Sequence, residues 1–155
     1  MKLALDWSHP VKLRTAGSEE NLIYKVDDGL PNSAGVYIFG RRFNKKFEAL
    51  YVGQAGSIRS RVQTHLKGNV SLMLHLRKAK NGQRVVLAGR FLPKPGQQEA
   101  KCLKLLERAL LRYFLSEGHD LVNKQGARLS RHEVASRHPR GVVPALMFVD
   151  RGKGE

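Results

Sequence analysis

Two short runs of alternating apolar and aromatic residues mark the first half of the chain. They are GVYIF at 35–39 and ALYVG at 49–53, and the GRRFNKKFE segment between them is polar and basic. Period-two alternation is typical of half-buried strands, and such a polar segment suits an exposed hairpin loop. Antiparallel pairing of the two runs would bring Tyr37 and Tyr51 close together. A third strand is predicted at 83–93, QRVVLAGRFLP.

Helical spacing of apolar residues follows these runs. A helix is predicted to begin after Ser57, a favourable N-cap, and to end at Gly68 and Asn69. Residues 71–80 predict a second helix, and residues from about Gln97 to Leu115 predict the longest one. The buried stripe of the first helix is Ile58, Val62 and Leu66, and the ridge of the longest helix is Leu103, Leu106, Leu110 and Phe114.

The rest of the chain is less regular. From Asn123 it is basic and predicted to be loop until VVPALMFVD at 142–150, a candidate late strand. Strands and helices are mixed without a regular alternation, so we expect a small α+β domain with an antiparallel sheet. The chain has no internal repeat, and its 155 residues suit one compact domain.

The charge points to a polyanionic partner. Twenty-eight Lys and Arg against thirteen Asp and Glu give a net charge of +15. Nucleic acid is the favoured partner because each phosphate contact releases condensed counterions. Association with a membrane surface or a ribosome, or a role in solubility alone, would also account for an excess of this kind.

Composition also bounds the compartment and the type of site. The single cysteine, Cys102, excludes an internal disulfide and a cysteine-based zinc site. No apolar run approaches the roughly 20 residues of a membrane span. Asp6 and His9 interrupt the apolar start that a signal peptide would need. We therefore expect a cytoplasmic protein with no membrane partner.

Four short features then occur in order: GVY at 35–37, YVG at 51–53, Arg61 on the predicted first helix, and LLERALLRYF followed by LVN at 121–123. This order and spacing resemble the GIY-YIG nuclease family, with Val in place of Ile in both triplets. The run YVGQAGSIRSRVQTHL resembles the excision-repair branch of that family. Repair members carry lysine after the second triplet, where this chain has Gln54.

The resemblance implies a fold, a reaction and a set of residues. The fold is a central three-stranded antiparallel sheet flanked by helices. It spans a nuclease core at 35–123, between an N-terminal extension at 1–34 and a basic C-terminal extension at 124–155 that packs on or beside the core. The reaction is hydrolysis of DNA phosphodiester bonds, leaving a 5′-phosphate and a 3′-hydroxyl. The implied catalytic residues are Tyr37, Tyr51, Arg61, His65 and Glu107, supported by Gly53, Gln54 and Asn123.

Residue chemistry leads in the same direction. Arg61 and His65 are four residues apart and project from one helix face. Arg61 can donate to two phosphate oxygens. Tyr37 would act as general base, although an ordinary phenol with a pKa of about 10 needs help to ionise, which Arg61 and His65 could supply. Tyr51 would orient the phosphate or the water. Without the resemblance, both tyrosines would be read as half-buried core residues, as Tyr24 and Tyr113 are.

Glu107 is the candidate ligand of one divalent ion. It lies on an otherwise apolar helix, where a carboxylate is costly unless it is paired or binds metal. A single carboxylate with phosphate and water oxygens suits Mg²⁺ or Mn²⁺. A solvated glutamate, or an ion pair with Lys104, Arg108 or Arg112, is the alternative role for Glu107. Glu99, two turns earlier on the same helix, is a weaker alternative to Glu107 as the ligand.

DNA, single- or double-stranded, is the predicted partner, and three functions remain open. They are a free-standing endonuclease, an inactive or partner-dependent nucleic-acid-binding module, and a nuclease subunit of a homodimer or larger complex. The residues expected to contact DNA are Arg41, Arg42, Lys45, Lys46, Arg59 and Lys67, together with Arg128, Arg131, Arg137 and Arg140 in the C-terminal extension.

Overall fold

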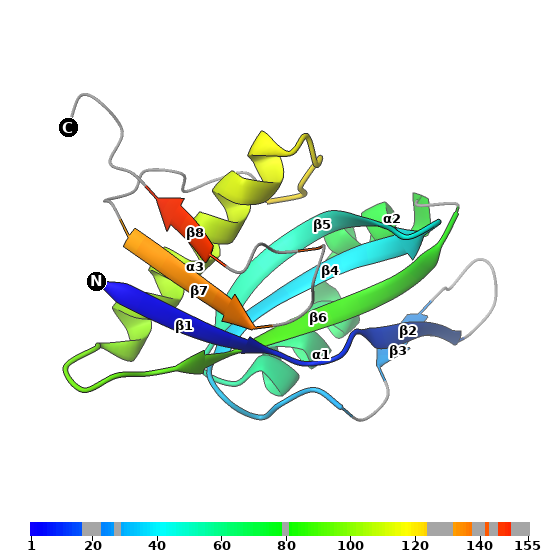
Figure 1. Ribbon diagram of the computed structural model, residues 1–155. Helices are drawn as coiled ribbons and strands as arrows, with labels where there is room; N and C mark the ends of the chain where they lie inside the picture. Colours follow the sequence, from blue (N-terminus) through cyan, green and yellow to red (C-terminus); the bar gives the residue numbers. More distant parts are fainter. Residues whose placement is uncertain are drawn as a thin grey trace.

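The computed structural model describes residues 1–16, 23–26, 29–78, 81–123, 132–137, 142 and 146–149. The α+β class predicted from the sequence is confirmed: these residues form three helices and a large sheet (Figure 1). The elements in chain order are β1 (Lys2–Trp7), β2 (Val11–Ala16), β3 (Ile23–Val26), β4 (Gly35–Phe43), β5 (Lys46–Ala55), α1 (Ile58–Gly68), α2 (Val70–Lys78), β6 (Gln83–Leu92), α3 (Glu99–Ser116), β7 (His132–Arg137) and β8 (Leu146–Val149).

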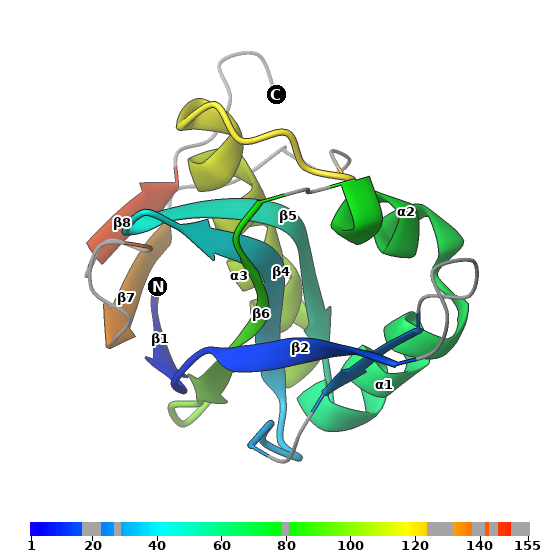
Figure 2. The ribbon, with the colours of Figure 1, turned by 90° about the vertical axis from the view of Figure 1, so that its right-hand side faces the viewer.

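Strand β6 organises the sheet. Along one side it pairs with β4, which in turn pairs with β5; along the other side it pairs first with β2 and then with β1. The path through the second side is β3-β2-β6-β1-β7-β8. All these pairs are antiparallel except β1 with β7, which is parallel. The sheet is strongly curved, and β2 crosses in front of β4 and β6 when the molecule is viewed end on (Figure 2).

The prediction of a three-stranded sheet is therefore wrong. The three predicted strands exist and pair in the order β5-β4-β6, but β1, β2 and β3 before them and β7 and β8 after them extend the sheet. β7 lies in a stretch whose sequence predicts loop. The N-terminal KLALDW run alternates in burial along β1, with Leu3, Leu5 and Trp7 buried. That period-two pattern is the signal for a half-buried strand.

The hairpin between β4 and β5 is longer than predicted, and its loop is shorter. Both strands continue into the expected loop and leave only Asn44 and Lys45 as the turn, with φ of 47° and 63°. Positive φ at both central residues is characteristic of the two-residue type I′ turn, whose twist matches that of paired strands. Within this longer pairing Arg41 is opposite Glu48, and the two form a salt bridge across the strands, with 2.6 Å between Arg41 Nη2 and Glu48 Oε2.

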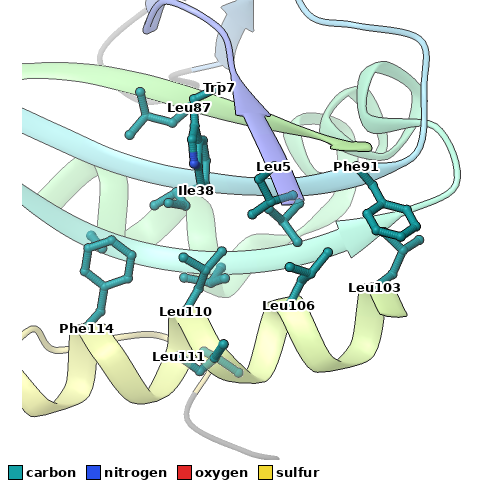
Figure 3. Packing of buried hydrophobic residues seen from close by; sticks show 14 of the residues in the cluster. Leu5, Trp7, Ile38, Leu87, Phe91, Leu103, Leu106, Leu110, Leu111 and Phe114 are labelled. Atoms are coloured by element: carbon teal, nitrogen blue, oxygen red, sulfur yellow. The ribbon is translucent and has the colours of Figure 1, made fainter. Parts of the chain in front are cut away.

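The sheet buries a core on each face. On one face, α3 packs its Leu103, Leu106, Leu110 and Phe114 ridge against residues from β1, β4 and β6, as Figure 3 shows. On the other face, Tyr37, Phe39 and other side chains pack under α1 and α2. Successive residues of β4 alternate between the two cores, because side chains of a strand point to opposite faces. The hairpin thus lies between α3 and the α1–α2 pair.

All three predicted helices are confirmed, with bounds that differ by a few residues. The Ile58, Val62 and Leu66 stripe of α1 is buried as expected. Ser57 occupies the N-cap position, but its hydroxyl bonds to Asn32 and not to the helix backbone. Within the described part of the chain, no helix combines the length and the apolar composition required to cross a membrane.

Candidate active site

The two tyrosines of the GVY and YVG triplets lie side by side on the face of the hairpin that α1 covers. Their rings are nearly parallel, with centroids 6.4 Å apart. Tyr37 is opposite Gly53 and Phe39 is opposite Tyr51, so the tyrosines are diagonal neighbours across the pair. The register then shifts, leaving Leu50 without a partner. Such bulges are frequent next to active sites because they redirect side chains.

The glycines of the triplets are explained by close contacts. A Cβ on Gly53 would lie 2.3 Å from both Cζ and Oη of Tyr37, so the phenol ring occupies the space that a side chain would need. A Cβ on Gly35 would lie 2.1 Å from the carbonyl oxygen of Gly89 in β6. Gly53 therefore sets the position of the Tyr37 ring, and Gly35 allows β4 to approach β6.

Helix α1 places His65 against both tyrosines. Tyr37 Oη and His65 Nε2 share a hydrogen bond of 2.7 Å, and the imidazole packs edge-on to Tyr51 with centroids 4.9 Å apart. His65 is the buried polar residue of the described core, with 7% of its surface exposed. Burial and the nearby Arg61 charge lower the pKa of His65 to about 4, so that the ring is neutral at physiological pH.

Arg61 lies one turn before His65 and is exposed. Burial raises the pKa of Tyr37 well above the usual range, and Tyr51 and Glu107 add to the effect. The nearby Arg61 guanidinium acts in the opposite direction and favours the phenolate. Burial, followed by Glu107, also raises the pKa of Tyr51, while Arg61 lowers it. The positive charge of Arg61 therefore acts on both phenols and opposes the rise in their pKa values.

Glu107 lies on α3, the helix on the opposite face of the hairpin, and acts on this group through its charge. It is half-buried, between the buried residues Leu106 and Leu110 and beside Arg108. Burial raises the pKa of its carboxyl group, and the charges of Arg108 and Arg61 lower it. Glu107 therefore interacts electrostatically with Arg61 as well as with the two tyrosines.

Asn123 supports the YVG strand from its outer edge. Its side-chain oxygen accepts a hydrogen bond of 3.1 Å from the Val52 N–H, and its amide nitrogen donates to the Val52 carbonyl. Val122 N–H donates to the Leu50 carbonyl at 2.7 Å, and His119 Nδ1 accepts from the Ala49 N–H at 2.9 Å. The segment after α3 therefore pairs with the outer edge of β5 and holds it in place.

Gln54 lies apart from the tyrosine face. It is opposite Val36, one position beyond Gly53, and strand alternation directs it to the face that α3 covers. The position at which repair-type GIY-YIG nucleases carry lysine is thus on the Glu107 side of the hairpin, and the Gln54 side chain there is half-buried and neutral.

The residues expected to contact DNA have different surroundings. Arg41 is engaged within the protein: it pairs with Glu48, donates to the Asn81 carbonyl at 3.2 Å and lies 4.5 Å from the centroid of Phe43. Arg59 is exposed, although its Nε donates to the Leu30 carbonyl. The other exposed cations of this set are Arg42, Lys45, Lys46 and Lys67. Arg128, Arg131 and Arg140 lie outside the described residues, and Arg137 is described only through its β7 backbone.

Two residues near the site are not singled out by the sequence patterns. His119, at the edge of β5, follows the last helix in a stretch with no recognisable motif. Asn69 is predicted only to end α1, yet it bonds to the His65 ring and to the start of α2. An asparagine directly before an apolar helical run is a favoured N-cap, and this is the available signal.

The described residues thus group Tyr37, Tyr51 and His65 by direct contact, with Arg61 on the same helix as His65, and the charge of Glu107 on α3 acts on both tyrosines. Comparisons of the whole chain with models of protein families, with curated protein sequences and with solved structures gave no match.

Proposed function

We propose that this protein is a metal-dependent endonuclease that hydrolyses DNA phosphodiester bonds by the single-metal mechanism of GIY-YIG nucleases. The observation that carries the proposal is a cluster of two stacked phenols and a buried neutral imidazole, with an exposed guanidinium and a half-buried carboxylate whose charges act on both phenols. Perturbed titratable groups from separate elements are typical of catalytic sites. The net charge of +15 supports a polyanionic substrate.

Each side chain has a role that follows from its surroundings. Tyr37 Oη takes the proton of the attacking water, because His65 lies against this oxygen and the charge of Arg61 favours its ionised form. Arg61 is exposed and can bind two phosphate oxygens, stabilising the charge that develops on them. Tyr51 is half-buried beside Tyr37 and orients the phosphate or the water.

The donor set fits Mg²⁺ or Mn²⁺ only with help from the substrate. Among the described residues, no three His, Cys, Asp or Glu side chains come together as a ready-made metal site. Glu107 is a single hard oxygen ligand, and hydrated Mg²⁺ is commonly held by one or two carboxylates plus phosphate and water oxygens. Such an ion would be held by Glu107 and would stabilise negative charge on the leaving 3′ oxygen.

A second candidate is an inactive or partner-dependent DNA-binding module of the same type. It is favoured by burial, which raises the pKa of Tyr37 and makes the phenolate harder to form, and by Gln54, which adds no positive charge where repair-type nucleases carry lysine. In the active enzyme, the charge of Glu107, which raises the pKa of Tyr37, would be offset by its ion. The two candidates therefore differ in whether the isolated chain cleaves DNA.

Cleavage of plasmid, hairpin, nicked and single-stranded DNA with Mg²⁺ or Mn²⁺ separates them. We expect the isolated chain to cut at least one substrate, and Glu107→Gln and Arg61→Ala to reduce kcat by roughly 10²-fold or more. Glu99→Gln is the matched control, because Glu99 is an exposed carboxylate two turns earlier on the same helix. Full activity of Glu107→Gln, or loss in Glu99→Gln instead, would contradict the assigned site.

A further inference from the structure

A chain of hydrogen bonds leads from the start of α2 to the phenol of Tyr37. Asn69 joins α1 to α2 and is the residue directly before Val70, where α2 begins. Its Oδ1 accepts a hydrogen bond of 3.1 Å from the Leu72 N–H, as expected for an N-cap side chain. Its Nδ2 lies 2.9 Å from His65 Nδ1. His65 Nε2 lies 2.7 Å from Tyr37 Oη.

The donor in each of these hydrogen bonds can be assigned by starting from the Leu72 backbone N–H. A backbone N–H can only donate, so the Asn69 atom that faces Leu72 must be the oxygen. The atom that faces His65 is then the NH₂ group, which can only donate. His65 Nδ1 must therefore accept and carry no proton. A neutral imidazole has one N–H, so the proton is on Nε2, which faces Tyr37.

This tautomer determines how Tyr37 is hydrogen-bonded. The Tyr37 oxygen accepts from His65 Nε2–H, and the nearby positive charge of Arg61 favours the ionised phenol. Because the oxygen already accepts from His65, the phenolic hydrogen is directed to another group. A phenolate at this position would keep the hydrogen bond from His65. His65 can therefore stabilise the ionised phenol but cannot accept its proton.

The surroundings of His65 hold it in this neutral state. Tyr37 faces it from β4, Tyr51 from β5 and Arg61 from its own helix, while Phe39 adds an apolar wall. Asn69 is the neighbour from the α2 side and carries no charge. Burial and Arg61 are the causes that lower the pKa of His65, and no carboxylate of the described residues is among them.

We infer that Asn69 is a positioning residue: it holds His65 as the Nε2–H tautomer, so that the imidazole donates to Tyr37 Oη and leaves the phenol able to exchange its proton with the attacking water. This rests on the proposed nuclease function for its catalytic meaning. The tautomer itself can be measured without any activity.

Asn69→Asp separates this role from simple helix capping. Aspartate is as good an N-cap as asparagine, so the bond from Leu72 N–H is kept. The group facing His65 changes from a donor to an acceptor, which favours a proton on Nδ1. Asn81→Asp is the matched control, because it makes the same change at an exposed position before β6.

The tautomer is read from the ¹⁵N shifts of the two ring nitrogens of His65 by NMR at pH 8. We expect the unmodified protein and Asn81→Asp to carry the proton on Nε2, and Asn69→Asp to gain a proton on Nδ1. We expect kcat for DNA cleavage to fall roughly tenfold or more in Asn69→Asp, with little change in KM or Tm.

Three results would overturn the inference. They are a proton on Nδ1 in the unmodified protein, an unprotonated Nδ1 in Asn69→Asp, and an altered tautomer with unchanged kcat. If the unmodified protein cleaves no DNA, the proposed function fails, and the inferred control of Tyr37 in catalysis fails with it. The NMR measurement then still decides whether Asn69 sets the tautomer.

Discussion

Gly53 and Tyr37 face each other across the β4–β5 pair, and the Tyr37 ring occupies the space that a side chain at position 53 would need. Because a Cβ on Gly53 would lie 2.3 Å from the phenol oxygen, Gly53→Ala has to displace the ring from His65. We expect this variant to lose about 1–3 kcal/mol of unfolding free energy in urea titrations and most of its cleavage activity.

Gly56→Ala is the control for this change. Gly56 is exposed, and a Cβ there would meet only the Glu99 carboxylate at 3.9 Å. We expect its stability and its cleavage rate to stay close to those of the unmodified protein. Equal behaviour of the two alanine variants would show that the phenol is not held by Gly53.

His65 makes stability depend on pH in a predictable direction. Its pKa is about 4 in the folded chain and about 6.5 in an unfolded one, so the unfolded chain binds the proton first as the pH falls. The stability from neutral His65 is complete above pH 6.5 and is lost progressively toward pH 4, by roughly 3 kcal/mol in all.

This contribution can be isolated by a variant that does not titrate. We expect the free energy of unfolding of the unmodified protein to fall more steeply between pH 7 and 5 than that of His65→Gln, when both are measured by urea titration. The difference between the two slopes removes the contributions of other groups, among them Glu107. Parallel slopes would mean that the imidazole is protonated as easily in the folded chain as in the unfolded one.

At the scale of elements, a local sequence pattern predicts a helix or strand when residues close in the sequence decide which of its side chains are buried. The GVYIF and ALYVG runs alternate because Tyr37 and Ile38 point to different cores, and the α3 ridge follows a helical period. The parallel pair of β1 and β7 joins Lys2 to Glu133, a pairing that no local window contains. These outer strands are also only four to six residues long, which weakens any period-two signal.

Residues of the candidate site can likewise be predicted where they are close in the sequence, and not where their roles depend on long-range contacts. Arg61 and His65 are predicted together because a helix brings residues four apart onto one face. The role of Asn69 depends on which way its amide faces between two helices. Its spacing in the sequence does not contain that information.

The edge of β5 is an element-scale feature that can be tested directly. Asn123→Ala removes both bonds to Val52 and leaves its N–H and carbonyl unpaired in a partly buried setting. We expect a loss of about 1–3 kcal/mol in unfolding free energy and faster hydrogen exchange of the Val52 amide. Asn81→Ala, at an exposed position, is the control, and unchanged exchange at Val52 in Asn123→Ala would contradict this role.

At the scale of the whole molecule, the proposed function implies that the net charge of +15 makes binding to DNA depend on salt. Each phosphate neutralised by a Lys or Arg contributes about −0.9 to the slope of log K against log salt for duplex DNA. Arg42 and Lys46 are exposed near the tip of the β4–β5 hairpin, whereas Arg41 is held by Glu48. In binding assays with EDTA present to prevent cleavage, we expect Arg42→Gln/Lys46→Gln to reduce the magnitude of the slope by about one to two, because each substitution leaves one phosphate without its cation.

Lys101→Gln/Lys104→Gln is the control: it removes the same charge from the exposed side of α3 and should leave the slope nearly unchanged. An equal reduction in both double variants would mean that DNA responds to the total charge of the protein and that the hairpin does not bind phosphates itself.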